Sequence, residues 1–373
     1  NELGHEVDAV ATVKALPDPA HYLAAAKLVR SVTLVRRYPN PFGILGREPL
    51  QLRTRRRLAS LRLTRSYDVV LLEQEYVAPA LDAPELDCGR VILRVHNDEP
   101  AYYHDLAQSE RCWWRRLYYL EEARRFRSAS PAVFEKAGDL WFISCDHWRR
   151  WRASHPEANQ RAVWLPAALP GPLRPPHDGS GERVLITGNL FQPTNLEGLE
   201  WFLNEVHPWL VRRQNYELCV AGSTRGARAR AVLDRLGATP RVQVHVNSPD
   251  LETLYRSAAV FVNPMQRGVS VKLKTLDAMC HGLPVVSTAA GLDGAGFEPG
   301  KHALLAESGP AMAEAIARLL EAPDERRALV ENAQDYLVKR YDHRANLERL
   351  LAPPAEARGI EFEAASRHPG RVR

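Results

Sequence analysis

The stretch of residues 259–288 constrains the fold of this chain more tightly than any other. It opens with an apolar run typical of a buried strand and then passes through a loop that contains Gly268. Residues 272–280 follow a helical pattern, which a glycine and a proline end before a second apolar run at 285–287. Strand, loop, helix and strand in this order predict one unit of a parallel α/β sheet with a right-handed crossover.

The loop inside this stretch has the features of an anion site. Gly268 leaves a row of backbone N–H groups at the start of the predicted helix, where the helix dipole favours negative charge. Lys272 and Lys274 lie at the same end, although only seven of the chain's 50 basic residues are lysine. The pattern predicts a phosphate-binding site. A solvated helix start with incidental lysines is the alternative that the local pattern leaves open.

Strands and helices alternate on both sides of a segment rich in proline and glycine. The 373 residues suffice for two α/β domains. Residues 166–182 hold five prolines and three glycines, a composition typical of a linker. We therefore predict a first domain over residues 1–168, a linker over 169–182, a second domain over 183–340 and a partly mobile tail over 341–373.

The first domain is expected to begin inside its fold. Residues 3–7 resemble a helix end that turns into a strand over 7–13, so we expect a further strand and helix to precede them. The sequence pattern also predicts two helices, one over 49–63 and a long one over 105–137 that breaks near Pro131.

Positive charge is concentrated in the first half of the chain. The formal net charge is +5 and the isoelectric point is about 9.0. Residues 51–65 carry six arginines and no acid, and residues 111–127 carry six more beside aromatic residues such as Trp113 and Trp114. Contact with an anionic membrane face, nucleic-acid binding and plain arginine-rich helix surfaces all fit this pattern. No nucleic-acid-binding module accompanies the charge.

Composition and motifs exclude several classes of protein. No apolar run approaches the roughly 18 residues of a membrane span. The five cysteines are scattered without CxxC spacing, which indicates a reducing compartment and argues against a disulfide framework or a zinc site. The chain lacks GxGxxG, Walker A, GxSxG, HExxH and DxD motifs. Nicotinamide enzymes, P-loop nucleotidases, serine hydrolases, zinc proteases and metal-bridged sugar transferases therefore lose support.

Polar residues at the predicted strand ends are the candidates for chemistry, because parallel sheets bind ligands beyond the carboxyl ends of their strands. His96 could serve as a general acid or base or as a hydrogen-bonding group. The alternative is a strand-end histidine that only forms hydrogen bonds with the backbone. Asp277 follows the lysines by one helical turn and fits either a ribose contact or a plain surface acid. The other strand-end candidates are Glu73, Glu75, Asn97, Glu99, Ser144, Gly188, Asn189, Gly222 and Ser223.

Several motifs in the second half resemble one enzyme family. GVSVKLKTLDAMCHGLPVVST at 268–288 looks like the donor-site signature of the group-one retaining glycosyltransferases of family four, and residues 186–210, 218–223 and 241–264 agree in order and spacing. The resemblance covers about 184–340 and extends more loosely to GHEV, LRVHNDEPAYYHDLA and WFISCDHW in the first half. It implies the GT-B fold, in which two Rossmann-like α/β domains face each other across a cleft.

The resemblance also implies an activity. A hexosyltransferase of this kind moves a sugar from a nucleotide-diphosphate sugar to a carbohydrate or lipid-linked glycan acceptor. It is metal-independent, uses no cofactor and retains the configuration of the sugar. Such an enzyme is expected to be bacterial, cytoplasmic and engaged in polysaccharide biosynthesis. Contact with the inner membrane face is compatible with the basic and aromatic clusters, and nucleic acid is not an expected partner.

The family's roles map onto this sequence residue by residue. The resemblance implies that His96, Lys274 and Asp277 are catalytic, and that Asn97 and Glu99 lie on the acceptor side. Backbone amides of the donor loop would add to the phosphate site. The donor-binding residues implied are Gly188, Asn189, Gly222, Gly268, Val269, Ser270, Val271 and Lys272.

Three departures from the family pattern keep alternatives open. Val269 occupies the position where the paired-glutamate motif has its first acid, and Asp277 is one methylene shorter than the usual glutamate. The glycine-rich loop of the family's first strand is not among these residues. A catalytically impaired nucleotide-sugar-binding protein is therefore one alternative. A GT-B sugar-nucleotide epimerase is another, although it would need further carboxylates in the cleft.

Overall fold

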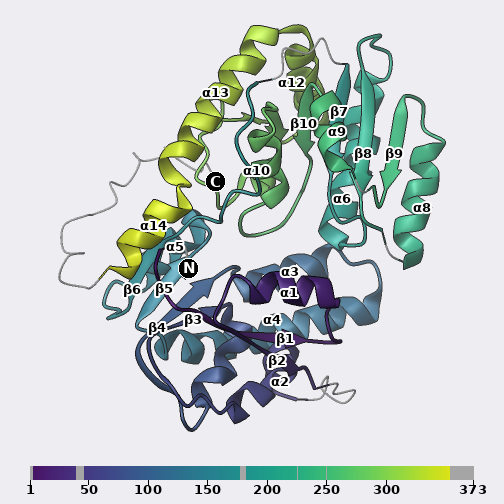
Figure 1. Ribbon diagram of the computed structural model, residues 1–373. Coiled ribbons are helices and arrows are strands. Elements are labelled where there is room, and N and C mark those ends of the chain that lie inside the picture. The colour runs from purple at the N-terminus through teal and green to yellow at the C-terminus, as the bar shows by residue number, and fades with distance from the viewer. Residues whose placement is uncertain (1–2, 39–45, 177–181, 225, 249, 353–373) are drawn as a thin grey trace.

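A computed structural model describes residues 3–38, 46–176, 182–224, 226–248 and 250–352. Every strand pair among these residues is parallel, and helices connect the strands (Figure 1). The predicted parallel α/β class is confirmed. Within the same residues, no helix combines the length and apolarity needed to cross a bilayer.

The second half of the chain builds a six-stranded sheet in the order β12-β11-β10-β7-β8-β9. Its strands are β7 (Arg183–Thr187), β8 (Glu217–Gly222), β9 (Val242–Val246), β10 (Val260–Asn263), β11 (Val285–Ser287) and β12 (Leu304–Leu305). Its helical segments are α6 (Pro193–Trp201), η4 (Phe202–Val206), α7 (His207–Leu210), α8 (Gly226–Gly237), α9 (Leu251–Ser257), α10 (Leu273–Cys280), α11 (Ala289–Leu292), α12 (Gly309–Glu321) and α13 (Pro323–Arg340). The strand order reverses beside β7, and parallel sheets bind ligands at such a switch point.

The stretch that opened the sequence analysis folds as predicted. β10 leads through the loop around Gly268 into α10, and the chain returns as β11 beside β10, with Phe261 opposite Val285. All residues of β10 and β11 are buried. This explains why both strands appear in the sequence as continuous apolar runs instead of alternating patterns.

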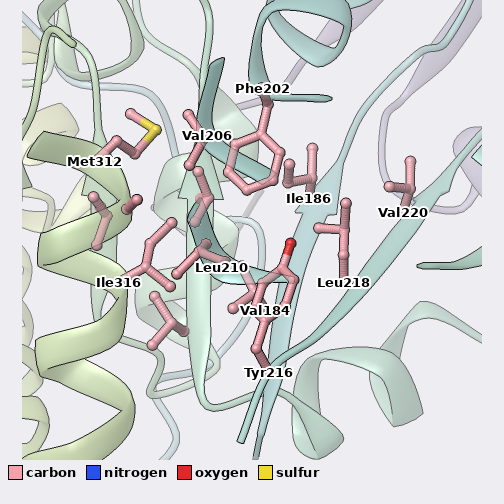
Figure 2. Close-up of a cluster of buried hydrophobic side chains, with 14 of the residues drawn as sticks. Val184, Ile186, Phe202, Val206, Leu210, Tyr216, Leu218, Val220, Met312 and Ile316 are labelled. Atoms are coloured by element: carbon pink, nitrogen blue, oxygen red, sulfur yellow. The ribbon is translucent and has the colours of Figure 1, made fainter. Parts of the chain in front are cut away.

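One hydrophobic cluster fixes the helices against a face of this sheet (Figure 2). Each fully buried aliphatic side chain contributes about 1.5–3 kcal/mol relative to exposure, so the cluster positions the strand ends firmly. Its members include Val184, Ile186, Phe202, Val206, Leu210, Tyr216, Leu218, Val220, Met312 and Ile316.

The first half builds a four-stranded sheet in the order β3-β4-β5-β6 and a separate two-stranded sheet, β1-β2. The strands are β1 (Asp8–Val13), β2 (Ser31–Arg36), β3 (Ser66–Glu73), β4 (Asp87–Val95), β5 (Asp139–Phe142) and β6 (Arg161–Trp164). The Tyr67 hydroxyl donates to Asp8 Oδ2 at 3.2 Å, which joins the amino-terminal ends of β3 and β1. Its helical segments are α1 (Pro19–Ala26), α2 (Leu50–Arg53), η2 (Arg56–Ser60), η3 (Glu75–Asp82), α3 (Glu99–Ser109), α4 (Trp113–Glu135) and α5 (Cys145–Ser154).

Two helices of the first half differ from their predicted boundaries. The helix predicted over 105–137 is two helices, α3 and α4, that meet around Glu110, while Pro131 lies inside α4. The Glu110 carboxylate accepts a hydrogen bond from the Cys112 N–H at 3.0 Å, and this local bond competes with helix continuation. The helix predicted over 49–63 is instead the short α2 followed by the 3-10 turn η2.

The predicted tail also differs at its start, because His343–Leu351 form helix α14. Asp342 caps this helix by accepting a hydrogen bond from the Ala345 N–H at 2.9 Å. Leu350 is buried against Trp141 and other residues of the first half, so the chain returns to the half from which it started (Figure 1). Sequence periodicity over such a short helix was too weak to separate it from the polar residues that follow. Residues 353–373 lie outside the described part of the chain.

Candidate active site

Contacts between the two halves bring the end of β4 to the loop of residues 268–272 between β10 and α10, called the donor loop below. The Ser270 hydroxyl donates to the backbone carbonyl of His96 at 2.5 Å. A second contact joins the Gly294 N–H to Asp146 Oδ2 at 2.9 Å, at the start of α5. Two of the residues that the sequence singled out, His96 in the first half and Ser270 in the second, are therefore in direct contact.

Lys274 lies at the start of α10 and points toward the switch point of the second sheet. Its Nζ donates to Asn195 Oδ1 at 3.1 Å, and Asn195 Nδ2 donates to the Asn189 carbonyl at 3.1 Å. The side chain is half-buried, and desolvation followed by the charge of Lys272 lowers the pKa of Lys274 to about 7. No carboxylate of the described residues forms an ion pair with Lys274. A desolvated ammonium with only an amide partner is suited to an anionic ligand.

Glycine is required where the ends of β7 and β8 meet. A Cβ atom on Gly222 would lie 1.8 Å from the Gly188 carbonyl oxygen, so only glycine allows this approach. Next to it, the Ser223 hydroxyl donates to Asn189 Oδ1 at 2.7 Å. The structure thus gathers the predicted Gly188, Asn189 and Gly222 beside Asn195, the partner of Lys274.

The donor loop is held in a strained conformation by its own contacts. Ser270 has a positive φ of 77°, which is uncommon for a residue with a side chain, and its N–H donates to Asp293 Oδ2 at 3.0 Å. That amide is therefore engaged by a carboxylate, whereas the sequence predicted it to be available to phosphate. Lys272 Nζ donates to the Gly268 and Ser270 carbonyls, and desolvation lowers the pKa of Lys272 to about 8 despite the opposing charges of Asp293 and Asp105. The hydrogen bonds of Lys272 therefore stabilise the conformation of the loop.

Val269 and Val271 flank Ser270 in the same loop. Both side chains are half-buried, and Val271 packs against the hydrophobic cluster on the α10 side of the sheet. Val269 contributes no charge at the position where the family pattern has an acid.

His96 lies directly after β4, with its ring about one-third exposed (33%). Its Nε2 is 2.7 Å from Glu73 Oε2 at the end of β3. Partial burial opposes ionisation of Glu73, but the hydrogen bond with His96 and the charge of Arg94 hold the pKa of Glu73 below its usual range. An ionised carboxylate on one nitrogen fixes the tautomer and orientation of the imidazole, which is the arrangement of an oriented acid–base group.

Asn97 is half-buried and Glu99 is buried beside it. Asn97 Nδ2 donates to Glu99 Oε1 at 3.1 Å, and the Tyr76 hydroxyl donates to the other carboxylate oxygen of Glu99. Only 1% of the Glu99 surface is exposed, and this burial raises its pKa. Glu99 therefore supports the segment that follows His96.

Asp277 lies one turn after Lys274 on α10, in a separate cluster of contacts. Its Oδ1 is 3.4 Å from His281 Nδ1, and the His281 ring stacks on Tyr255 with the centroids 4.4 Å apart. Glu252 contacts the other nitrogen of His281 at 2.9 Å. The carboxylate of Asp277 is 29% exposed, so it remains accessible to a ligand.

Sequence reasoning missed Asn195 and Asp293 and gave Glu73 no specific role, yet all three residues hold this site together. Asn195 joins Lys274 to the β7 turn, Asp293 engages the donor loop, and Glu73 orients His96. Glu73 was noted only as one of several strand-end residues. Asn195 lies inside the 186–210 stretch that resembles the family, where nothing in the sequence distinguishes it from its neighbours, and Asp293 directly follows α11.

Comparison with known proteins identifies the class of protein that this fold and site define. The sequence model of the family described as glycosyl transferases group 1 matches residues 181–322. A Klebsiella pneumoniae protein described as an uncharacterized 44.6 kDa protein in cps region is 31% identical over 351 residues, which cover 91% of this chain and 88% of that protein. The chain belongs to the group 1 glycosyl transferases, and it is a glycosyltransferase by family.

Solved structures agree on the fold. Sucrose-phosphate synthase from Thermosynechococcus elongatus superposes with a TM-score of 0.64 at 17% identity, covering 94% of this chain and 90% of the other. HepE of Anabaena, in complex with UDP and glucose, superposes with a TM-score of 0.63 at 14% identity and covers 92% of each chain. The longer TarM structure also matches, with a TM-score of 0.57 at 13% identity; 76% of this chain is covered but only 54% of TarM. These likenesses confirm the GT-B fold, whereas membership of family four stays a prediction.

Proposed function

We propose that this protein transfers a hexosyl group from a nucleotide-diphosphate sugar to a carbohydrate or lipid-linked glycan acceptor, without a metal ion and with retention of configuration. The observation that carries the proposal is the half-buried ammonium of Lys274. It pairs with no carboxylate in the described part of the chain, and Asn195 links it to the Gly188–Asn189 turn. The HepE structure contains UDP and glucose, which supports a nucleotide-sugar donor.

The donor diphosphate would lie between Lys274 and the turn after β7. As the bond to the sugar breaks, negative charge grows on the leaving diphosphate, and a preoriented ammonium stabilises that charge more in the transition state than in the ground state. Gly222 and Gly188 keep side chains away from this position. In this proposal Asp277 accepts hydrogen bonds from the ribose hydroxyls, and its shorter side chain makes them longer than a glutamate would.

His96 is proposed to contact the transferred sugar on the acceptor side. Glu73 orients its ring, and the Ser270 hydroxyl fixes its backbone against the donor loop. Donor binding at the loop would therefore position the group that faces the acceptor. Retention rests on the family resemblance and is tested by the anomeric configuration of the product, read by NMR.

The test of this function is donor turnover in matched variants. The purified protein is first screened by thermal shift against UDP-, GDP- and ADP-sugars, because a ligand stabilises the folded state according to its affinity. Release of the nucleoside diphosphate from the best donor is then measured in EDTA. Lys274→Ala and His96→Ala should lose turnover, and Lys301→Ala, which changes an exposed lysine paired with Glu298, should keep it. Turnover that disappears in EDTA would contradict the metal-independent scheme.

We also propose peripheral contact with an anionic, cytoplasmic membrane face, through the first two turns of α4. Trp113, Trp114 and Leu117 are 76%, 55% and 60% exposed, and exposed Arg116 lies beside them. Aromatic and aliphatic side chains flanked by arginine suit the interface of an anionic bilayer. The Trp113→Ala, Leu117→Ala double variant should lose binding to phosphatidylglycerol vesicles, while Trp209→Ala, which removes another exposed tryptophan (62%), should keep it. Equal binding by all three proteins would contradict this surface.

The relative in a cps region supports a role in polysaccharide biosynthesis. A glycan built on a lipid carrier would be delivered at the membrane, which agrees with the proposed contact surface.

A further inference from the structure

Arg55 is a buried guanidinium held entirely by neutral groups. Only 6% of its surface is exposed. Its Nη1 donates to the backbone carbonyl and the Oε1 of Gln51 at 2.8 and 2.7 Å, and its Nε donates to Thr12 Oγ1 at 3.2 Å. The guanidinium also lies over the ring of Tyr76, 5.2 Å from the centroid. These contacts fix its position, and none of the described residues supplies a counter-ion for its charge.

The charge nearest to Arg55 is another arginine. Burial, and after it the positive charge of Arg37, lowers the pKa of Arg55 to about 10. Arg37 Nε is itself buried, and none of the described residues forms a hydrogen bond with it. Among the described residues, no carboxylate forms an ion pair or hydrogen bond with either arginine, whereas buried Arg125 in the same half pairs with Glu121 and Glu122. Two like charges in a desolvated setting are costly unless an anion joins them.

The pair lies near the carboxyl ends of strands in the first half. Thr12 is near the carboxyl end of β1, Arg37 directly follows β2, and Tyr76 follows β3. From Tyr76 a chain of hydrogen bonds runs to Glu99 and on to Asn97, the neighbour of His96. Arg55 is therefore linked through Tyr76 and Glu99 to the segment that holds His96, in the half that does not hold the proposed diphosphate site.

We propose that Arg37 and Arg55 bind an oxyanion, a phosphate ester or a carboxylate, that is carried by the acceptor. The assignment to the acceptor rests on the proposed function, but the anion site itself does not. Guanidinium groups recognise phosphate and carboxylate through paired N–H donors, and Arg55 is already oriented by its bonds to Gln51 and Thr12. The acceptor would thus be an acidic or phosphorylated glycan, and a neutral sugar would bind weakly.

The site is tested by titrating the protein, saturated with UDP, with inorganic pyrophosphate and separately with D-glucuronate in a calorimeter. Saturation with UDP removes the Lys274 site from the measurement. The wild-type protein should bind at least one of the two probes, and the Arg37→Gln, Arg55→Gln double variant should bind it at least about tenfold more weakly. Pyrophosphate binding identifies the phosphate class, and glucuronate binding identifies the carboxylate class. Arg36→Gln removes the same charge from the exposed neighbouring position and should leave binding unchanged.

Arg37→Gln alone separates a binding role from a structural one. Because Arg37 repels Arg55, this variant should melt at or above the wild-type temperature without anion, and it should lose the rise in melting temperature that the anion causes. A lower melting temperature without anion would reveal a structural partner of Arg37 and overturn the proposal. Failure of both probes to bind the wild-type protein, or equal weakening by Arg36→Gln, would also overturn it. If UDP does not bind, the donor proposal fails, while the same titration of Lys274→Ala protein still tests the arginine pair.

Discussion

Binding of UDP should take up a proton, because Lys274 has a depressed pKa in the free protein. Desolvation, followed by the charge of Lys272, lowers that pKa to about 7. A bound diphosphate favours the charged ammonium, so the pKa in the complex should rise toward its usual value near 10.5. The protonated form binds the ligand. Affinity is therefore highest below the free pKa and falls as pH rises from about 7 toward the pKa of the complex.

The size of this effect follows from the protonated fraction. With a free pKa of about 7, the protonated fraction falls roughly eightfold between pH 7.5 and 8.5, and the affinity for UDP should fall by up to the same factor. The half-buried setting screens part of this effect, so eightfold is the upper value. Lys272, whose pKa is lowered to about 8, adds to the decline at the alkaline end.

Isothermal titration calorimetry measures the proton directly. Titrations at pH 8 in buffers of different ionisation enthalpy should give an uptake approaching one proton per UDP bound. Lys274→Met should weaken binding and remove most of the uptake, whereas Lys301→Met, an exposed lysine, should behave as wild type. An affinity that is constant from pH 7 to 9, with no proton taken up, would refute the assignment of Lys274 to the diphosphate.

Three further predictions concern stability. Gly222→Ala forces a Cβ atom to 1.8 Å from a carbonyl oxygen and should lower stability by about 1–3 kcal/mol in urea unfolding, while Gly237→Ala, with nothing within 4 Å, should not. Burial raises the pKa of Glu75 to about 8, so folding retains a proton that the unfolded chain releases above about 4.5. The stability of the wild-type protein should then fall as pH rises from about 4.5 to about 8. In thermal melts, the melting temperature of Glu75→Gln should fall less over this range, and an equal fall in both proteins would refute the role of Glu75. Leu350→Ala should cost about 2–5 kcal/mol, because this side chain is 1% exposed and packs on Trp141; a loss below 1 kcal/mol would show that α14 does not dock.

The sequence predicted best what depends on neighbouring residues. The β10–loop–α10–β11 unit was correct because apolar runs, helical spacing and a glycine stop all lie within 30 residues. Gly188, Asn189 and Gly222 could be chosen from the strand-end rule alone, and the structure brings them together. These features depend on local backbone geometry, which sequence patterns encode directly.

Contacts between residues far apart in the sequence could not be predicted. The bond between Lys274 and Asn195 joins positions 79 residues apart, and the Ser270–His96 bond joins positions 174 apart. The two lysines also have different contacts: Lys272 bonds to its own loop, and Lys274 points toward the turn after β7. This difference depends on side-chain directions, which the spacing of the lysines in the sequence does not predict. The lack of a counter-ion for Arg55 among the described residues likewise could not be predicted. It depends on residues far apart in the sequence, such as Thr12 and Tyr76, that surround the guanidinium.

The most direct test of the whole account is release of a nucleoside diphosphate from a nucleotide sugar by the purified protein in EDTA, compared among wild type, Lys274→Ala, His96→Ala and Lys301→Ala. The account predicts turnover by the wild-type and Lys301→Ala proteins and its loss in the other two. Tight binding of the nucleotide sugar without turnover, with or without an acidic glycan acceptor, would contradict it.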